Sequence, residues 1–287
     1  MNAIPENLPP VFQRRRTDSG ALVDNLSFLI QEPADVYHAK RPKYLSSHQL
    51  AEFRRNPLLY HKKQLGLVKD EDRPAFLLGR AAHTLILEGR EAYEREFAVG
   101  GPINPKTGEP FGSRTKAFLE WADAQGKPVL TDDQVLLVEN LNAAVHAHEH
   151  AAALLADGVP EGVIRVDYCD VPCQARLDWF SPTRGVVDLK TADNLDWFEN
   201  DARNYGYIHQ LSFYRSLLVA VTGIYFSVYL IAVEKREPFR CGVWRVSEEV
   251  LGGAQKENEA AIARLQECRK LDTWPTGYET PRVLDWL

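Results

Sequence analysis

Two aspartates and a lysine of this chain have the types and spacing that phosphodiester hydrolysis requires. Asp178 ends one predicted strand, Asp188 follows ten residues later on the next strand, and Lys190 lies two residues beyond it. A strand's period of two puts Asp188 and Lys190 on one face, and a turn between the strands brings both carboxylates toward one point. Carboxylates hold Mg²⁺, which activates an attacking water, while an ammonium can position that water or offset transition-state charge.

The same side chains could instead form a salt-bridged, solvated strand face, because a short D-x-K motif often matches by chance. The surroundings favour a site. Apolar residues flank Asp188, and an amphipathic helix carrying Gln210 and Tyr214 follows the strand. This combination is much rarer than the tripeptide alone.

The elements that would position these residues alternate between helical and strand patterns. Residues 1–45 show no sustained period and are expected to form a weakly structured arm, while residues 46–287 are expected to form a single domain. Helices are predicted from the capping box at Ser46 to the break at Pro57, and over 58–65, 76–88, 115–125, 132–156, 204–221 and 248–271. Strands are predicted over 163–169, 171–180, 186–190, 225–233 and 239–246. Strands flanked by helices, with one crossover helix between them, indicate an α/β fold with a mixed sheet.

Composition excludes several classes of protein. With 45% hydrophobic and 26% charged residues in a chain of 287, the sequence is typical of a globular protein rather than a disordered or collagenous one. The most apolar stretch, residues 217–233, is interrupted by Thr222, Gly223 and Ser227, which excludes a transmembrane helix. The first residues lack the apolar core of a signal peptide, so we expect a cytoplasmic protein with no membrane partner.

Charge and cysteine content narrow the choice further. Lys and Arg number 34 against 40 Asp and Glu, a net charge of −6, which argues against histone-like binding of nucleic acid but allows a local basic channel. The cysteines at 169, 173, 241 and 268 match neither a zinc motif nor a disulfide framework, and we expect reduced thiols.

Six ordered blocks of the sequence resemble a known family. They are Gly79–Glu88, Ala175–Phe180, Val186–Ala192, Tyr205–Arg215, Ile231–Phe239 and Trp274–Tyr278. Over residues 46–280 the chain resembles the PD-(D/E)XK nuclease superfamily and, within it, the RecE-type exonucleases (exonuclease eight) of phages and prophages. The resemblance implies a restriction-endonuclease-like core, which is a central mixed β-sheet flanked by helices.

The resemblance also implies roles for single residues. It places His83, Asp178 and Asp188 around the metal ion, with the backbone carbonyl of Leu189 as a further ligand and Lys190 as the catalytic lysine. Taken alone, His83 would more often be an ordinary packed histidine, because imidazole packs and hydrogen-bonds without any metal.

Three more residues are implied beside the centre. Gln210 and Tyr214 match a Q-x-x-x-Y signature of RecB-like relatives, in which the two residues help to place the DNA. Glu161 resembles the acidic residue ahead of the core aspartate, in a register that the sequence leaves open. Tyr214 also lies on an apolar stripe and would serve as core in any case, and Gln210 could merely cap a strand edge.

The expected activity follows from the resemblance. It is a Mg²⁺-dependent exonuclease that degrades the 5′-ended strand of duplex DNA and leaves a 3′ overhang for recombination. The sequence leaves open whether Mn²⁺ can replace Mg²⁺. Some relatives bind an iron–sulfur cluster through four cysteines, and because this sequence lacks that arrangement we expect no cluster. Such relatives form homo-oligomeric rings and work beside a single-strand annealing protein. Two alternatives stay open: a RecB-like single-strand or structure-specific nuclease, and a non-catalytic DNA-binding recombination accessory.

Basic residues that could contact DNA phosphates are scattered along the sequence. The candidates are Arg54, Arg55, Lys62, Lys63 and Arg114. A solvated helix face would explain them equally well, since the chain is acidic as a whole.

Overall fold

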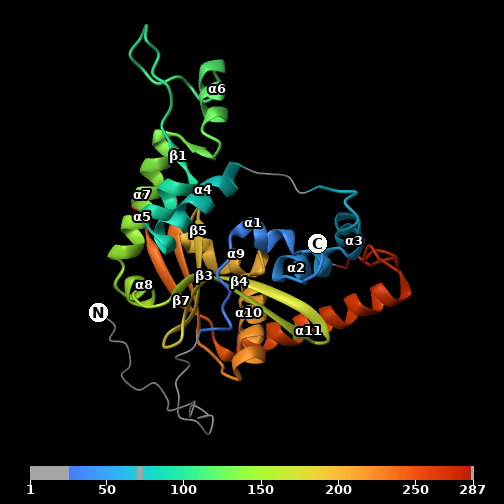
Figure 1. Cartoon of the computed structure of the whole chain (residues 1–287). Coiled ribbons are helices and arrows are strands. Elements are labelled where there is room, and N and C mark those ends of the chain that lie inside the picture. The colour runs from blue at the N-terminus through green and yellow to red at the C-terminus, as the bar shows by residue number, and fades with distance from the viewer. Residues whose placement is uncertain (1–25, 70–73, 286–287) are drawn as a thin grey trace.

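A five-stranded mixed sheet lies at the centre of the molecule. The computed structural model describes residues 26–69 and 74–285. The strands follow the sequence order β3-β4-β5-β6-β7, and every neighbouring pair is antiparallel except β5 and β6, which are parallel. Their bounds are β3 Val159–Tyr168, β4 Val171–Ser181, β5 Gly185–Ala192, β6 Val228–Glu234 and β7 Cys241–Arg245. The sheet, with helices on both faces, confirms the predicted fold class (Figure 1).

One face of the sheet is covered by the crossover between β5 and β6. A 3₁₀ turn, Leu195–Trp197, leads into α9 (Phe198–Asn204) and α10 (Tyr207–Thr222), and α10 packs against α2 (Ser47–Arg55) and α11 (Glu248–Leu271). The apolar side chains between them form the larger core, which includes Val186 and Ala192 of β5. The central part of α10, residues 211–218, is buried against these elements.

The opposite face carries a second core. It is covered by α4 (Pro74–His83), a π-helical turn Thr84–Glu88, α5 (Arg90–Glu96), α7 (Asp132–Ala147) and α8 (Glu149–Leu154). Val187 and Leu189 of β5 belong to this core, so alternate residues of one strand face different cores, as the period of two requires. Figure 1 shows α10 and α11 on one side of the strands and α4, α5 and α7 on the other.

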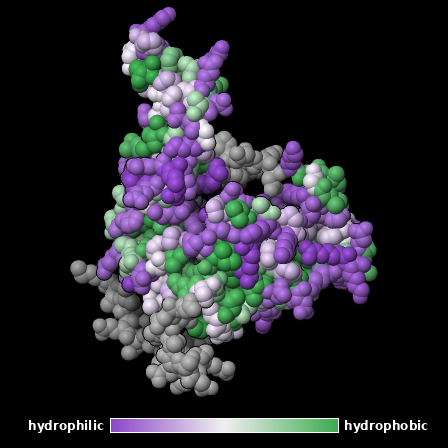
Figure 2. All heavy atoms as spheres, in the orientation of Figure 1, coloured by the Kyte–Doolittle hydropathy of each residue, from purple (hydrophilic) through white to green (hydrophobic). Residues whose placement is uncertain are grey.

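A small projection extends from the second face. The short strands β1 (Ala98–Val99) and β2 (Val129–Leu130) pair in parallel, and α6 (Lys116–Ala124) lies between them in sequence. The Gly- and Pro-rich residues 100–115 extend beyond these strands (Figure 1). Exposed apolar side chains, among them Ile103 and Leu119, alternate with hydrophilic ones on this projection (Figure 2).

Two of the predicted helices on the second face of the sheet differ from the structure. The helix predicted over 132–156 is two helices, because the Nδ1 atom of His148 accepts the N–H of Ala151 and caps the second one. The helix predicted over 76–88 changes from α to π winding after His83. The sequence analysis also missed α5, whose residues Arg90–Glu96 are mostly charged.

The segment 26–45, predicted as part of a weakly structured arm, is joined to the sheet. Ile30 exchanges backbone hydrogen bonds with Val163 of β3, and Leu45 pairs with Cys173 of β4. Between them, α1 (Ala34–Ala39) buries Tyr37. These are single contacts without a regular period, which is why the sequence pattern did not reveal them. Residues 1–25 of the predicted arm lie outside the described residues, and the domain boundary at 46 stays a prediction.

An ion-pair network holds the same segment. The carboxylate of Glu32, whose side chain is 7% exposed, accepts hydrogen bonds from the Arg165 guanidinium and from Lys40 at 2.7 Å. These bonds, led by the one from Arg165, lower the pKa of Glu32 to about 2.

Two further properties bear on the expectations from sequence. All four cysteines are free, with Cys173 and Cys268 buried. None of the helices in the described part of the chain combines the length and apolar character that a bilayer crossing needs.

Candidate active site

The sheet opens at the two aspartates. Strands β4 and β5 pair only from Ser181↔Gly185 to Trp179↔Val187, and the next residues in the same register would be Asp178 and Asp188. There the pairing stops. The Asp178 Oδ2 atom instead accepts the backbone N–H of Leu189 at 2.9 Å. A carboxylate thus occupies the donor that a continued ladder would have used, and the two strands separate around it.

Glu161 reaches the same place from β3. The pairs Pro160↔Trp179 and Gly162↔Leu177 flank it, so Glu161 lies opposite Asp178 on the neighbouring strand. Its backbone has a φ of 56°, a left-handed conformation that is uncommon for a residue with a side chain. The Glu161 carboxylate pairs with Arg176 at 2.8 Å.

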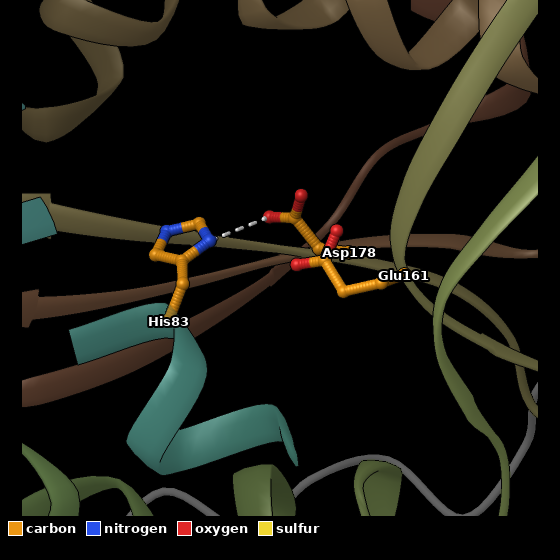
Figure 3. Close-up of side chains that lie close together, drawn as sticks. All are labelled: His83, Glu161 and Asp178. Atoms are coloured by element: carbon orange, nitrogen blue, oxygen red, sulfur yellow. Dashed lines mark ion pairs between the residues drawn. The ribbon is translucent and has the colours of Figure 1, made fainter. Parts of the chain in front are cut away.

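His83 completes a group of three. It is the last residue of α4, and its Nδ1 atom lies 3.5 Å from Asp178 Oδ2. One ligand atom each from His83, Glu161 and Asp178 lies within 4.8 Å of the others. Figure 3 shows the imidazole facing the two carboxylates. Two carboxylates and one imidazole nitrogen form a donor set that fits a divalent cation.

A second polar group lies on the α10 side of β5. The Lys190 ammonium contacts Asp188 Oδ2 at 2.6 Å, and the Asp188 side chain is only 1% exposed. Gln210 donates from Nε2 to Asp188 Oδ1 at 3.2 Å and to the Tyr214 hydroxyl at 2.8 Å. Because residues 210 and 214 are one turn apart on α10, the helix holds both against the aspartate.

Burial dominates the electrostatics of the first group. Burial raises the pKa of Glu161 to about 8, and the nearby Asp178 carboxylate adds to the rise. Burial lowers the pKa of His83 to about 4, the Lys190 charge acts in the same direction, and a hydrogen bond to the Leu189 backbone opposes both. In this state the carboxyl groups resist ionisation and the histidine stays neutral. A cation that binds there can take the place of the protons on the carboxyl groups.

Burial and the neighbouring charges together set the pKa values in the second group. Burial raises the pKa of Asp188 to about 6 against the opposing effect of Lys190. Burial alone lowers the pKa of Lys190, but the carboxylates of Asp188 and Asp178 outweigh it, and the pKa is raised. At neutral pH Lys190 is therefore a cation and a hydrogen-bond donor, and it has no lone pair with which to accept a proton.

Comparison with protein families decides the classification. Residues 46–283 match a family model described as a "PDDEXK-like domain of unknown function (DUF3799)". The chain belongs to this PDDEXK-like family. The match spans both groups of site residues. Nucleases of the PD-(D/E)XK type depend on divalent metals, which agrees with the donor set around Asp178.

A solved structure has the same PDDEXK-like architecture. The chain is similar to a protein from Eubacterium rectale whose crystal structure is described as that of a "putative exonuclease", with 15% sequence identity and a TM-score of 0.64. The match covers 90% of this chain and 96% of the other. At that identity the likeness shows the fold alone. No curated protein matches the chain.

The structure brings together the residues predicted for the PDDEXK-like site in two sets. Asp178, His83 and Glu161 form one set, and Asp188 forms the other with Lys190, Gln210 and Tyr214 (Figure 3 shows the first). The backbone of Leu189 connects them, because its N–H binds Asp178 while its neighbours on β5 are Asp188 and Lys190. Asp188 was predicted as a metal ligand beside His83 but is not among the three gathered atoms. The roles of all these residues stay predictions.

Sequence reasoning missed two neighbours of the site. Arg176, which pairs with Glu161, lies two residues before Asp178, so the period of two along the strand could have found it. Tyr207 lies three residues before Gln210, on the same side of α10, and the Lys190 ammonium sits 4.7 Å from the centre of its ring.

The predicted DNA-binding residues have mixed surroundings. Arg54 contacts both Glu257 at 2.9 Å and His209, Arg55 donates to the Asn204 carbonyl, and Lys63 pairs with Glu52. Lys62 and Arg114 are exposed. Contact with DNA stays a prediction for all five.

Proposed function

We propose that this chain is a metal-dependent nuclease that hydrolyses phosphodiester bonds of DNA. One observation carries the proposal: three ligand atoms of His83, Glu161 and Asp178 lie within 4.8 Å of one another, and Asp178 is hydrogen-bonded to the strand that carries the Asp188–Lys190 pair. The proposal is supported by the finding that the chain belongs to a PDDEXK-like family.

The three gathered residues would hold the cation, with Asp188 or the Leu189 carbonyl as further ligands. A divalent cation bound there would polarise a phosphate oxygen of the substrate and lower the pKa of a bound water. Asp178 is oriented for this task by the Leu189 N–H, which fixes its carboxylate at the opening of the sheet. Arg176 forms an ion pair with Glu161 at 2.8 Å.

Lys190 would act on the substrate as a fixed positive charge. Its raised pKa keeps the ammonium protonated, so it can hydrogen-bond the attacking oxygen or offset charge on the phosphate as the bond breaks. Asp188 holds the ammonium in place, and Gln210, which also contacts Tyr214, holds Asp188. A chain of contacts from α10 thus positions the charge before the substrate arrives.

For the substrate, we propose the ends of duplex DNA. The enzyme would degrade the 5′-ended strand, leave a 3′ overhang for recombination, and work as a homo-oligomeric ring beside a single-strand annealing protein in the cytoplasm of a bacterial host. The resemblance of six sequence blocks to RecE-type phage and prophage exonucleases supports this proposal. The Eubacterium rectale protein, described as a "putative exonuclease", is consistent with it.

The test is digestion of a linear duplex labelled separately at its 5′ and 3′ ends. We expect early release of the 5′ label that requires Mg²⁺, stops in EDTA and is lost in Lys190→Ala. Cleavage of single-stranded or branched DNA with the duplex left intact would favour the RecB-like alternative. DNA binding without cleavage of any substrate would leave the recombination accessory and contradict the nuclease.

A further inference from the structure

Two tyrosines lie side by side at the start of α10. Tyr205 is 61% exposed, and its ring centre lies 5.8 Å from that of Tyr207, with the ring planes inclined by 31°. Gly206 separates them with a φ of 75°, a left-handed conformation that glycine adopts without strain. This conformation ends the run from α9 and turns both rings to one side.

The tyrosine pair is continuous with the candidate active site. The Lys190 ammonium lies 4.7 Å from the centre of the Tyr207 ring, and the same ammonium contacts Asp188 at 2.6 Å. Tyr207 is backed by Phe198, whose ring centre is 6.3 Å away. A rigid series of contacts therefore leads from the acidic residue to the exposed ring of Tyr205.

An exposed, backed aromatic ring next to a phosphate-handling lysine suits one kind of ligand. Every nucleobase has a π-face, so a base stacks on tyrosine whatever its sequence, provided that it is not already stacked within a duplex. We propose that Tyr205, supported by Tyr207, is a stacking platform for an unpaired base of the strand whose phosphate lies at Lys190. The proposal rests on the nuclease function and adds what the site recognises beside the phosphate.

The platform is held by contacts that do not involve the Tyr205 ring. Arg55 of α2 donates to the Asn204 carbonyl at 3.1 Å, and the Tyr205 N–H donates to the Asp201 carbonyl at 2.8 Å. Removing the Tyr205 side chain therefore leaves the backbone anchored.

Tyr225 offers a matched control: it is 62% exposed and has Arg215 over its ring at 5.5 Å, but it lies beyond the other end of α10.

The experiment measures stacking directly. A DNA end with a two-nucleotide unpaired flap carries 2-aminopurine, whose fluorescence is quenched on stacking, and binding is followed in Ca²⁺ without turnover. We expect Tyr205→Ala to lose the quenching and to bind this end about 5- to 100-fold more weakly. Tyr205→Phe should keep both, and Tyr225→Ala should behave as wild type. With an abasic flap, wild type and Tyr205→Ala should bind alike.

The outcomes separate the platform from the nuclease. Unchanged quenching and affinity in Tyr205→Ala would overturn the platform, as would an equal loss on the abasic flap, even where Mg²⁺-dependent cleavage is normal. Tyr205-dependent quenching in a protein that cleaves nothing in Mg²⁺ would overturn the nuclease and leave base stacking established. Absence of DNA binding by wild type would overturn both.

Discussion

The backbone N–H of Leu189 donates to the side chain of Asp178 where the backbone of β4 would otherwise have paired with it. Under the proposed function this carboxylate would have two roles, one in completing the hydrogen bonding of a buried strand and one in holding a cation. Conservative and truncating substitutions separate these roles.

We predict that Asp178→Asn and Asp178→Ala differ in stability but not in activity. The amide oxygen of asparagine still accepts the Leu189 N–H, so Asp178→Asn should unfold within about 1 kcal/mol of wild type, whereas Asp178→Ala leaves a buried donor unpaired at a cost of about 1–3 kcal/mol. Both should lose cleavage by at least about a hundredfold, because a catalytic cation contributes several kcal/mol. Urea unfolding and an end-labelled digestion measure the two effects. Full activity in Asp178→Asn would remove this residue from the cation site.

The raised pKa of Glu161 predicts that the stability of the metal-free protein depends on pH. The pKa of Glu161 is about 8 in the folded state against 4.5 for an ordinary glutamate, so the folded state holds a proton that the unfolded state releases. This contribution is fully present below pH 4.5 and is lost as the pH rises through about 8. We expect Glu161→Gln to lose less stability than wild type between pH 5 and 9, measured by unfolding in EDTA.

Two controls accompany the Glu161 measurement. Glu109→Gln, at an exposed glutamate on the projection, should follow the wild-type curve. Ca²⁺ added at pH 9 should raise the melting temperature of wild type more than that of Glu161→Gln, because a cation takes the place of the proton. Parallel curves for Glu161→Gln and wild type in EDTA would contradict the buried, proton-holding state of this carboxyl.

Lys190 and Asp188 should behave as a coupled pair. Lys190→Met leaves a carboxylate that is 1% exposed without its cation, at an expected cost of about 3–5 kcal/mol. Adding Asp188→Asn should recover most of that stability without restoring cleavage, while DNA binding in Ca²⁺ is largely retained in fluorescence anisotropy. The exposed pair Lys235–Asp193, at 2.8 Å, is the control, since Lys235→Met should cost at most about 1 kcal/mol. Cleavage by the double variant would exclude a catalytic role for the lysine.

The Glu32 network predicts an acid-sensitive attachment of residues 26–45. The pKa of Glu32, about 2, lies below the 4.5 of an ordinary glutamate, so the stabilisation by this carboxylate is present above pH 4.5 and fades as the pH falls toward 2. Glu32→Gln should therefore cost about 1–3 kcal/mol at pH 7 and less at pH 3.5, in urea unfolding at both values. Glu91→Gln, at an exposed position of α5, should change neither value by as much. An equal cost for Glu32→Gln at both pH values would argue against the ion pair.

The parts of the site that follow a local period could be predicted from the sequence. Asp188 and Lys190 share a strand face through the period of two, and Gln210 and Tyr214 share a helix face through their spacing of four. The sheet of five strands with one parallel pair likewise followed from five strand patterns and a single crossover helix.

The rest depends on contacts between distant segments. Glu161 lies opposite Asp178 with a positive φ, and no pattern in a single sequence predicts this backbone conformation. The meeting of His83 with Asp178 joins residues 95 positions apart, and the resemblance to a family, rather than a pattern in the chain, selected that histidine. The change from α to π winding after His83 could not be predicted either, because apolar residues at helical spacing do not distinguish one kind of turn from the other.

Strand β5 is a shared wall between the two cores, with Val186 and Ala192 on one side and Val187 and Leu189 on the other. We therefore expect the two cores to unfold together, because loss of either one uncovers a face of the strand that both share. Amide protons of β5 should exchange with deuterium only when the whole fold opens, and more slowly than those of the projection around α6. The strand that carries Asp188 and Lys190 would thus be among the last parts of the chain to admit solvent.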